Sequence, residues 1–371
     1  MTLPRIGRRA FLGAGAAGAA SLLLPRAAGA RQEAPVWHDV RDWGVEGKGW
    51  AETARTFDRF PAKAEKTVPA PVWSLSRHSA GMLARFRTDS PAIHARWTLL
   101  HPALALPHMP ATGVSGVDLY ARDERERDRW LAVGKPVQQK MELRLAGPVD
   151  PLPSGGPRLY TIYLPLYNGT ESLEIGVDPK AAFEPVAPRT EKPIVFYGTS
   201  ILHGACASRP GMAFPAIVGR RLGRPTINLG FSGNGRMEPE VGALLAELDA
   251  GAYAIDCLPN MSAEQVAERT EPLVRQLRKA RPDAPILLVE DRTFTSAPFL
   301  KGTREAHAAR RAALRKAYEA LKAGGIGRLG YLEGEALLGD DGEGATDGSH
   351  PNDLGMLRYA EAYEKALLAL R

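Results

Sequence analysis

The sequence predicts an α/β fold with a doubly wound parallel sheet, preceded by an all-β sandwich or jelly-roll domain. Residues 31–178 contain short apolar runs separated by Pro, Gly, Asn and Asp, with no long helical period. From residue 193 to residue 371, strand-like runs alternate with helical ones. The chain of 371 residues is also longer than one ordinary hydrophobic core accommodates, so two domains are expected.

The first 30 residues are typical of an export signal. Residues 8–12 read RRAFL and precede an apolar stretch rich in Ala and Gly, and residues 28–30, AGA, have the small-x-small form of a peptidase site. The stretch is too short for a membrane-spanning helix, and the arginine pair predicts export by the twin-arginine pathway. A helical N-terminal arm is the alternative, but no acidic residue balances the arginines. We therefore expect a periplasmic or secreted protein whose mature chain has no membrane span.

The charge of the chain does not favour nucleic acid partners. The sequence has 48 Lys and Arg against 42 Asp and Glu, a net charge of +6. Cleavage after Ala30 removes four arginines and no acid, which leaves 44 basic and 42 acidic residues and a charge of about +2. The sequence contains no basic cluster interleaved with aromatic residues, so nucleic acid binding is not expected.

Five short runs predict the strands of the all-β domain, namely 83–88, 92–99, 117–120, 159–164 and 172–177. Apolar and polar residues alternate most clearly in 92–99, AIHARWTL, as in a strand with one buried face. Short strands between turn residues are typical of a sandwich or jelly roll. Four prolines then punctuate residues 179–193, so we expect a linker at 179–192.

The second domain, residues 193–371, is predicted to alternate strands and helices. The expected strands are 194–199, 225–231, 252–258, 285–290 and 328–333. The expected helices are 213–222, 239–248, 263–280, 304–323 and 353–369. Right-handed crossovers place such helices on both faces of a parallel sheet. Ligands of such sheets bind beyond the carboxyl ends of the strands.

Ser200, Asp347 and His350 are candidates for a hydrolytic triad. Ser200 closes the apolar run 194–200, IVFYGTS, and the other two lie three residues apart in 347–352, DGSHPN. Serine is a weak nucleophile until a base removes its proton, so His350 is the candidate base and Asp347 the acid that orients it. Taken alone, Ser200 is equally explained as a helix N-cap and Asp347 better explained as a turn residue. Their occurrence together favours the triad.

An acyl-transfer site also needs hydrogen-bond donors for the developing oxyanion. The candidates are the backbone N–H groups of Ser200 and Gly233 and the side-chain amide of Asn260. Other glycines near Gly233 leave its register open, and Asn260 could instead cap the helix that begins near residue 263.

Four further residues allow two interpretations each. Cys206 and Cys257 form a disulfide or remain buried free thiols. His203 lines the site or, preferably, occupies a solvated helix position. Arg209 contacts substrate or, preferably, forms a structural salt bridge. The eight histidines lack a metal-ligand spacing such as His-Glu-x-x-His, so neither a metal nor another cofactor is expected.

Residues 193–371 resemble the SGNH, or GDSL-like, hydrolase superfamily. The segment 198–200, GTS, matches the first family block with Thr where Asp is common, and 232–234, SGN, matches the second. The segment 258–260, LPN, stands in place of the usual Gly-x-Asn-Asp, and Asp347-x-x-His350 matches the fifth block. Residues 116–120, GVDLY, further resemble a bacterial subgroup whose hydrolase domain follows a β-domain with Gly-x-Asp-Leu-Tyr. The Gly-x-Ser-x-Gly elbow of α/β-hydrolases is absent.

The resemblance implies a flavodoxin-like three-layer α/β/α hydrolase domain after a jelly-roll-like domain. It also implies an exported serine esterase for small O-acyl esters of carbohydrates. Acetyl is the expected acyl group, because no long apolar segment indicates a fatty-acid tunnel. Two alternatives stay open, namely an O-acyltransferase with the same triad and an inactive carbohydrate-binding protein. The expected partner is a small-molecule or glycan ester, and the sequence does not indicate an oligomeric state.

Overall fold

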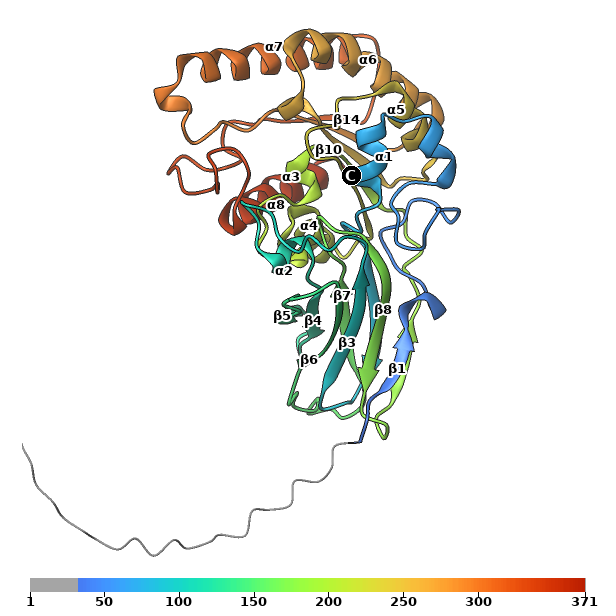
Figure 1. The fold of residues 1–371 in the computed structure, drawn as a ribbon. Helices are drawn as coiled ribbons and strands as arrows, with labels where there is room; N and C mark the ends of the chain where they lie inside the picture. The colour runs from blue at the N-terminus through green and yellow to red at the C-terminus, as the bar shows by residue number, and fades with distance from the viewer. Residues whose placement is uncertain (1–32, 371) are drawn as a thin grey trace, which may run out of the picture. The chain divides into compact units, whose positions relative to one another are not determined.

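A computed structural model describes residues 33–370, and the chain from Ala34 onward forms one compact unit (Figure 1). This unit contains two antiparallel sheets and one parallel sheet. The predicted export signal, residues 1–30, lies outside the described residues. Within the described part, no helix is long and apolar enough to cross a membrane.

The two antiparallel sheets form a sandwich around a shared core. One sheet has the order β1-β8-β3-β6, with strands at Val36–Asp39, Thr170–Val177, Ile93–Leu99 and Lys140–Ala146. The other has the order β5-β4-β7-β2-β9, with strands at Asp128–Val133, Asp118–Arg122, Arg158–Tyr163, Leu83–Thr88 and Phe183–Val186. Side chains from both sheets meet in one buried cluster that includes Phe86, Trp97, Ile162 and Ile175. The prediction of an all-β domain before the parallel sheet is confirmed.

The segment predicted as a linker, 179–192, contains strand β9. This strand pairs antiparallel with β2 at the edge of its sheet. The ring of Phe183 stacks on that of His38 at a centroid distance of 3.7 Å, which anchors the strand. Pro185 is compatible with this position because an edge strand leaves one side of its backbone unpaired. Strands β1, β5 and β6 are also additional to the predicted ones.

The second half forms a parallel sheet with helices on both faces (Figure 1). The order β11-β10-β12-β13-β14 comprises Thr226–Gly230, Ile194–Gly198, Ala252–Asp256, Ile286–Val289 and Leu329–Leu332. Val195 and Tyr197 of β10 face the core built with α5 (Pro239–Glu247), α6 (Ala263–Ala280) and α7 (Lys301–Ala323). Ile194 and Phe196 face the opposite core, built with α4 (Phe214–Leu222) and α8 (Asp353–Leu368). The predicted three-layer α/β/α arrangement is confirmed.

One segment within the range predicted for the sandwich packs on the α/β core instead. It comprises the short helices η2 (Ala62–Lys66) and α1 (Ala70–Ser76) and the residues before them. Its buried apolar side chains recur every four residues, as Phe60, Ala64, Val68 and Val72. The fully buried Arg59 donates from Nη1 to the carbonyl oxygens of Asn228 and Gly230 at 3.1 and 2.7 Å. These contacts fasten the N-terminal half to the end of β11.

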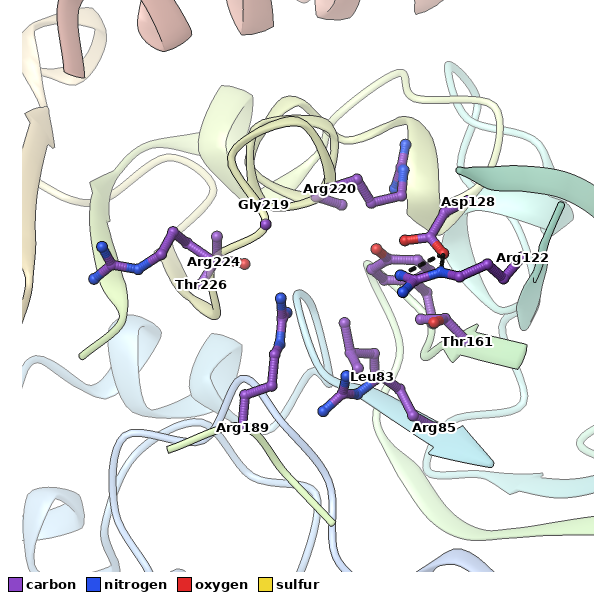
Figure 2. Close-up of a pocket in the computed structure, with 13 residues that line it drawn as sticks. Leu83, Arg85, Arg122, Asp128, Thr161, Arg189, Gly219, Arg220, Arg224 and Thr226 are labelled. Carbon is purple, nitrogen blue, oxygen red and sulfur yellow. Dashed lines mark hydrogen bonds and ion pairs between the residues drawn. The ribbon is translucent and has the colours of Figure 1, made fainter. Parts of the chain in front are cut away.

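A small cavity lies between the sandwich and the α/β part (Figure 2). Arg85 of β2 lines it from the sandwich, and Gly219 and Arg220 of α4 line it from the other side. Thr226, the first residue of β11, also contributes to its wall. The cavity therefore lies at the edge of the parallel sheet opposite to the one where Ser200 follows β10.

Candidate active site

Ser200 is the first residue of the short helix α3, Ser200–His203, directly after the buried strand β10. The hydroxyl of Thr199 caps this helix by accepting a hydrogen bond from the Ile201 N–H at 3.4 Å. The interpretation of Ser200 as the N-cap is therefore wrong. The Ser200 hydroxyl instead points toward a base, although only 7% of the residue is exposed.

The structure brings Ser200, His350 and Asp347 together in one chain of hydrogen bonds. The Oγ of Ser200 lies 2.9 Å from Nε2 of His350. The Nδ1 of His350 lies 2.7 Å from Oδ2 of Asp347. When Nδ1 carries the proton that faces the carboxylate, Nε2 is free to accept the serine proton. This is the geometry that a nucleophile, a base and an orienting acid require.

Asp347 is held as a carboxylate by its own loop. Its Oδ1 accepts hydrogen bonds from the backbone N–H groups of Ser349 and His350 at 3.0 and 2.8 Å. Partial burial acts to raise the pKa of Asp347, but these bonds and the imidazole of His350 outweigh it and lower the pKa to about 2. The acid therefore stays ionised at neutral pH.

The loop after β13 supports the loop that carries Asp347 and His350. The buried Arg292 donates from Nε to the carbonyl oxygen of Ser349 at 3.1 Å and from Nη2 to its hydroxyl. The Thr295 N–H donates to the carbonyl oxygen of Gly348 at 2.9 Å. Arg292 is itself paired with the buried carboxylate of Asp291. This network fixes the backbone from which both triad candidates project.

Gly233 follows β11, the strand beside β10. Gly198 at the end of β10 is in register with Gly230 of β11 and with Asp256 of β12, so the loops after the three strands leave the same edge. Gly233 has a φ of +68°, which favours glycine, and a Cβ built there would meet nothing within 4 Å. Open space therefore lies beside the α-carbon of Gly233.

Asn260 follows β12, in the short helix η4 (Leu258–Asn260). Its Nδ2 donates to the carbonyl oxygen of Asn234 at 2.7 Å, which ties it to the Gly233 loop. A primary amide has two N–H groups, so one remains for a ligand. Ser262, and not Asn260, caps α6, with Gln265 completing a capping box. The interpretation of Asn260 as the cap is therefore wrong, and its role as an oxyanion donor stays a prediction.

The sandwich contributes Tyr167 beneath the nucleophile candidate. Its hydroxyl donates to the backbone carbonyl oxygen of Ser200 at 3.2 Å, and its ring stacks on His203 at 4.1 Å. His203 is fully buried, so its interpretation as a solvated helix residue is wrong. Burial, the charge of Arg59 and the neighbouring imidazole of His78 hold the pKa of His203 well below its usual range. His203 is therefore neutral, and its contact with Tyr167 helps to hold α3 in place.

A second sandwich residue, His108, lies beside the base. Its exposed ring has its centroid 5.8 Å from that of His350. The next residue, Met109, is buried in the α/β core and fixes the loop. Tyr167 and His108 are additional to the site residues predicted from the sequence. Neither residue belongs to a recognisable sequence motif, so only the folded structure shows that they lie at the site.

The GVDLY segment docks the sandwich on the residues that follow α3. The fully buried Asp118 accepts hydrogen bonds at Oδ2 from Arg209 Nη1 and from the Gly211 N–H, both at 2.8 Å. Arg209 Nη1 also donates to the hydroxyl of Tyr120 at 2.6 Å. The prediction of Arg209 as a structural salt-bridge residue is confirmed. The GVDLY segment therefore joins the sandwich to the α/β part, and its role is structural.

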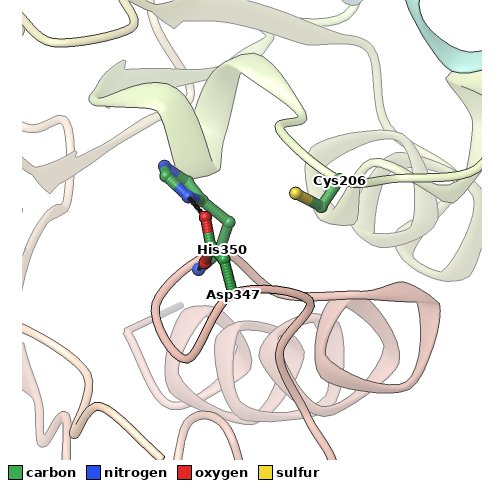
Figure 3. Close-up of side chains that lie close together, drawn as sticks. All are labelled: Cys206, Asp347 and His350. Atoms are coloured by element: carbon green, nitrogen blue, oxygen red, sulfur yellow. Dashed lines mark hydrogen bonds and ion pairs between the residues drawn. The ribbon is translucent and has the colours of Figure 1, made fainter. Parts of the chain in front are cut away.

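Both cysteines are free and buried, so the disulfide interpretation is wrong. The Sγ of Cys206, a carboxylate oxygen of Asp347 and a ring nitrogen of His350 lie within 4.8 Å of one another (Figure 3). Metal binding needs a thiolate, whereas burial raises the pKa of the Cys206 thiol to about 11. Asp347 and His350 are also bonded to each other. The group therefore fits acid–base chemistry better than a metal.

Comparisons with known proteins agree with this architecture. Residues 191–368 match the model of the GDSL-like lipase/acylhydrolase family. Residues 35–183 match a model for the N-terminus of SGNH-hydrolase-type esterases. A comparison with curated proteins gave no match.

Solved structures share the whole fold. A protein from Bacteroides ovatus described as a GDSL-like lipase is 35% identical, with 90% of this chain and 97% of that chain covered and a TM-score of 0.85. The salicylyl-acyltransferase SsfX3 of a tetracycline biosynthetic pathway is 20% identical, with coverage of 92% and 98% and a TM-score of 0.70. The acetyl xylan esterase Est2A from Butyrivibrio proteoclasticus is 11% identical, with coverage of 91% and 100% and a TM-score of 0.54. The chain therefore belongs to the GDSL-like lipase/acylhydrolase family. It is an ester-hydrolysing enzyme.

Proposed function

We propose that this enzyme is an exported serine esterase that removes small acyl groups, acetyl by preference, from carbohydrate esters. In this proposal Ser200 is the nucleophile, His350 the general base and Asp347 the residue that orients the base. The observation that carries it is the unbroken chain from Ser200 Oγ to His350 at 2.9 Å and from His350 to Asp347 at 2.7 Å.

The first half-reaction forms an acyl-enzyme. Ser200 Oγ attacks the ester carbonyl carbon while its proton passes to Nε2 of His350, and Asp347 stabilises the resulting imidazolium. The carbonyl oxygen becomes an oxyanion that accepts hydrogen bonds from the N–H groups of Ser200 and Gly233 and from the Asn260 amide. As the first residue of a helix, Ser200 has an N–H without an acceptor in that helix. His350 then gives its proton to the leaving alkoxide as the C–O bond breaks.

The second half-reaction restores the enzyme. A water molecule attacks the acyl carbon and gives its proton to Nε2 of His350. The second tetrahedral intermediate collapses, the bond to Ser200 Oγ breaks, and His350 returns the proton to that oxygen. The products are the carboxylic acid and the alcohol, and the triad is again in its starting state.

Two observations support a carbohydrate leaving group. The side chains of His350 and Asp347 are 25% and 39% exposed, so the site is open enough for a bulky alcohol. The exposed imidazole of His108, beside the base, can exchange hydrogen bonds with sugar hydroxyls. The fold of an acetyl xylan esterase is similar along the whole chain, which favours acetyl as the acyl group.

The test is acyl-group and alcohol profiling of the purified protein. Acetate release from acetylated xylo-oligosaccharides is expected to exceed butyrate and octanoate release from matched esters at least tenfold in kcat/KM. Ser200→Ala is expected to abolish turnover, whereas Ser154→Ala, in an exposed sandwich loop, retains it. Equal rates for octanoyl esters would contradict the small acyl group, and turnover by Ser200→Ala would contradict the nucleophile.

The alternative function is that of an O-acyltransferase, because a salicylyl-acyltransferase has a similar fold. The acyl-enzyme would then be attacked by a sugar hydroxyl instead of water. Product analysis in excess acceptor sugar separates the two reactions. Free acetate as the main product supports the esterase, and acetylated acceptor as the main product supports the transferase.

Export completes the proposal, and it depends on residues outside the described part of the chain. The arginine pair Arg8 and Arg9 before an apolar stretch supports twin-arginine export. Replacing both arginines with lysine is expected to leave the protein in the cytoplasm, as followed by fractionation of the cells. Unchanged export of this double variant would contradict the pathway.

A further inference from the structure

The cavity between the sandwich and α4 carries an excess of positive charge (Figure 2). Its volume is ≈ 60 Å³, and Asp128 is the one carboxylate among its lining residues. Five arginines also line it, namely Arg85, Arg122, Arg189, Arg220 and Arg224. Figure 2 shows Arg122 beside Asp128 on one side and the guanidinium of Arg189 pointing into the space between the two parts.

The available carboxylates do not balance these arginines. Arg122 binds Asp128 at 2.9 Å. Arg85 and Arg189 share a single carboxylate, Glu46, at 2.6 and 2.8 Å. Like charges held this close in a partly enclosed site repel one another. An anion in the cavity would relieve that repulsion.

Arg220 and Arg224 form no ion pair within the described part of the chain. Arg220 donates to the carbonyl oxygen of Gly211 at 2.7 Å and lies over the ring of Tyr120 at 4.2 Å. Its other partner is the neutral side chain of Tyr163. Arg224 donates to the carbonyl oxygen of Lys192. The buried Nε of Arg224 finds no hydrogen-bond partner among the described residues. Buried charge is costly when it has no oppositely charged partner, so both arginines favour a bound anion.

We propose that this cavity binds a small tetrahedral oxyanion, either inorganic phosphate or inorganic sulfate. Guanidinium groups bind such ions through paired N–H···O bonds. The ≈ 60 Å³ of space admits one such ion and is far below the roughly 300–1,000 Å³ of pockets for larger ligands. The bound anion joins β2 of the sandwich to α4 of the hydrolase part. It lies at the opposite edge of the sheet from Ser200, so it stabilises the fold and takes no part in ester hydrolysis.

The test is thermal unfolding of the full chain in phosphate, in sulfate and in chloride at matched ionic strength. A ligand that binds only the folded state raises Tm in a saturable way. We expect this response with phosphate and sulfate but not with chloride. For Arg189→Gln the apparent Kd is expected to rise at least tenfold, and Arg220→Gln gives the same test through a second cavity residue. Arg221→Gln is the matched control, because this neighbour pairs with Glu361 and Glu364 instead.

The proposal is overturned if chloride raises Tm as much as phosphate and sulfate do. It is also overturned if Arg189→Gln and Arg220→Gln respond to the anions as Arg221→Gln does. The readout is stability and not turnover, so this result is independent of the proposed esterase activity.

Discussion

Tyr167 of the sandwich donates a hydrogen bond to the backbone carbonyl oxygen of Ser200 at 3.2 Å. The ring of the same tyrosine stacks on His203, the last residue of the helix that begins with Ser200. The N-terminal sandwich is therefore part of the structure that positions the nucleophile candidate, and not a separate appendage.

Tyr167→Phe is expected to lower kcat about fivefold with an unchanged KM. The variant keeps the stacked ring and loses one hydrogen bond of about 1 kcal/mol that holds the Ser200 backbone. Tyr253→Phe is the matched control, since the Tyr253 hydroxyl also donates to backbone carbonyl oxygens, those of Leu245 and Leu248 at 3.0 Å, away from the site. Steady-state kinetics of both variants check this. Equal kcat values for the two would show that the Tyr167 bond is only structural.

Asn260→Ala is expected to lower kcat by about a hundredfold to a thousandfold, the usual effect of losing one oxyanion donor. Because the donor acts mainly in the transition state, KM is expected to change little. The variant also loses the bond to the carbonyl oxygen of Asn234, so its melting temperature must be measured alongside its kinetics. A folded variant with kcat within threefold of the wild type would remove Asn260 from the oxyanion site.

Asp118→Asn is expected to lower the free energy of unfolding by about 3 kcal/mol. The change removes the charge that Arg209 contacts at 2.8 Å in a fully buried position, which leaves the guanidinium without its ion-pair partner. Glu126→Gln, at a largely exposed position in the turn between β4 and β5, is expected to change stability by less than about 0.5 kcal/mol. Urea denaturation measures both. Similar effects for the two variants would show that the GVDLY motif does not hold the junction.

Asp256 predicts a pH-dependent stability. This carboxyl is buried at the end of β12 and accepts a hydrogen bond from the hydroxyl of Tyr363 at 2.7 Å. Burial raises its pKa to about 7, although the Tyr363 bond and the charge of Arg292 oppose the shift. Between about pH 4 and pH 7 the folded state thus keeps a proton that the unfolded state has lost. The free energy of unfolding is therefore not reduced by Asp256 below about pH 4, and it falls as the pH rises from 4 to 7.

Asp256→Asn removes this loss. The variant is expected to gain stability relative to the wild type between pH 4 and pH 8, by up to about 4 kcal/mol, because the wild-type carboxyl keeps its raised pKa of about 7. Urea denaturation at both pH values measures it, with the exposed Asp283→Asn as the control. A difference between Asp256→Asn and wild type that is the same at both pH values would contradict the raised pKa.

The α/β part could be predicted closely because its signals are local. Buried parallel strands appear as apolar runs, and α6 occupies the predicted range, Ala263–Ala280. The triad candidates were accessible for a similar reason: Ser200 closes such a run, and Asp347 and His350 stand three residues apart in a short recognisable motif.

The rest depends on contacts between distant parts of the chain. Tyr167 and His108 come to the site only because the sandwich packs beside it, and no spacing in the sequence encodes that contact. Strand β9 contains a proline that its edge position permits. The four-residue spacing from Phe60 to Val72 is a helical signal that was present in the sequence, but only the structure shows which core it covers.

The most direct test of the central claim, that Ser200 is an activated nucleophile, is covalent labelling. The full chain is incubated with a small fluorophosphonate, and the adduct is located by mass spectrometry of its peptides. The structure predicts one adduct, on Ser200, in the wild type and none in His350→Ala, because the base 2.9 Å away must accept the serine proton. A folded wild-type protein without an adduct, or His350→Ala labelled at the same rate, would contradict the serine esterase mechanism.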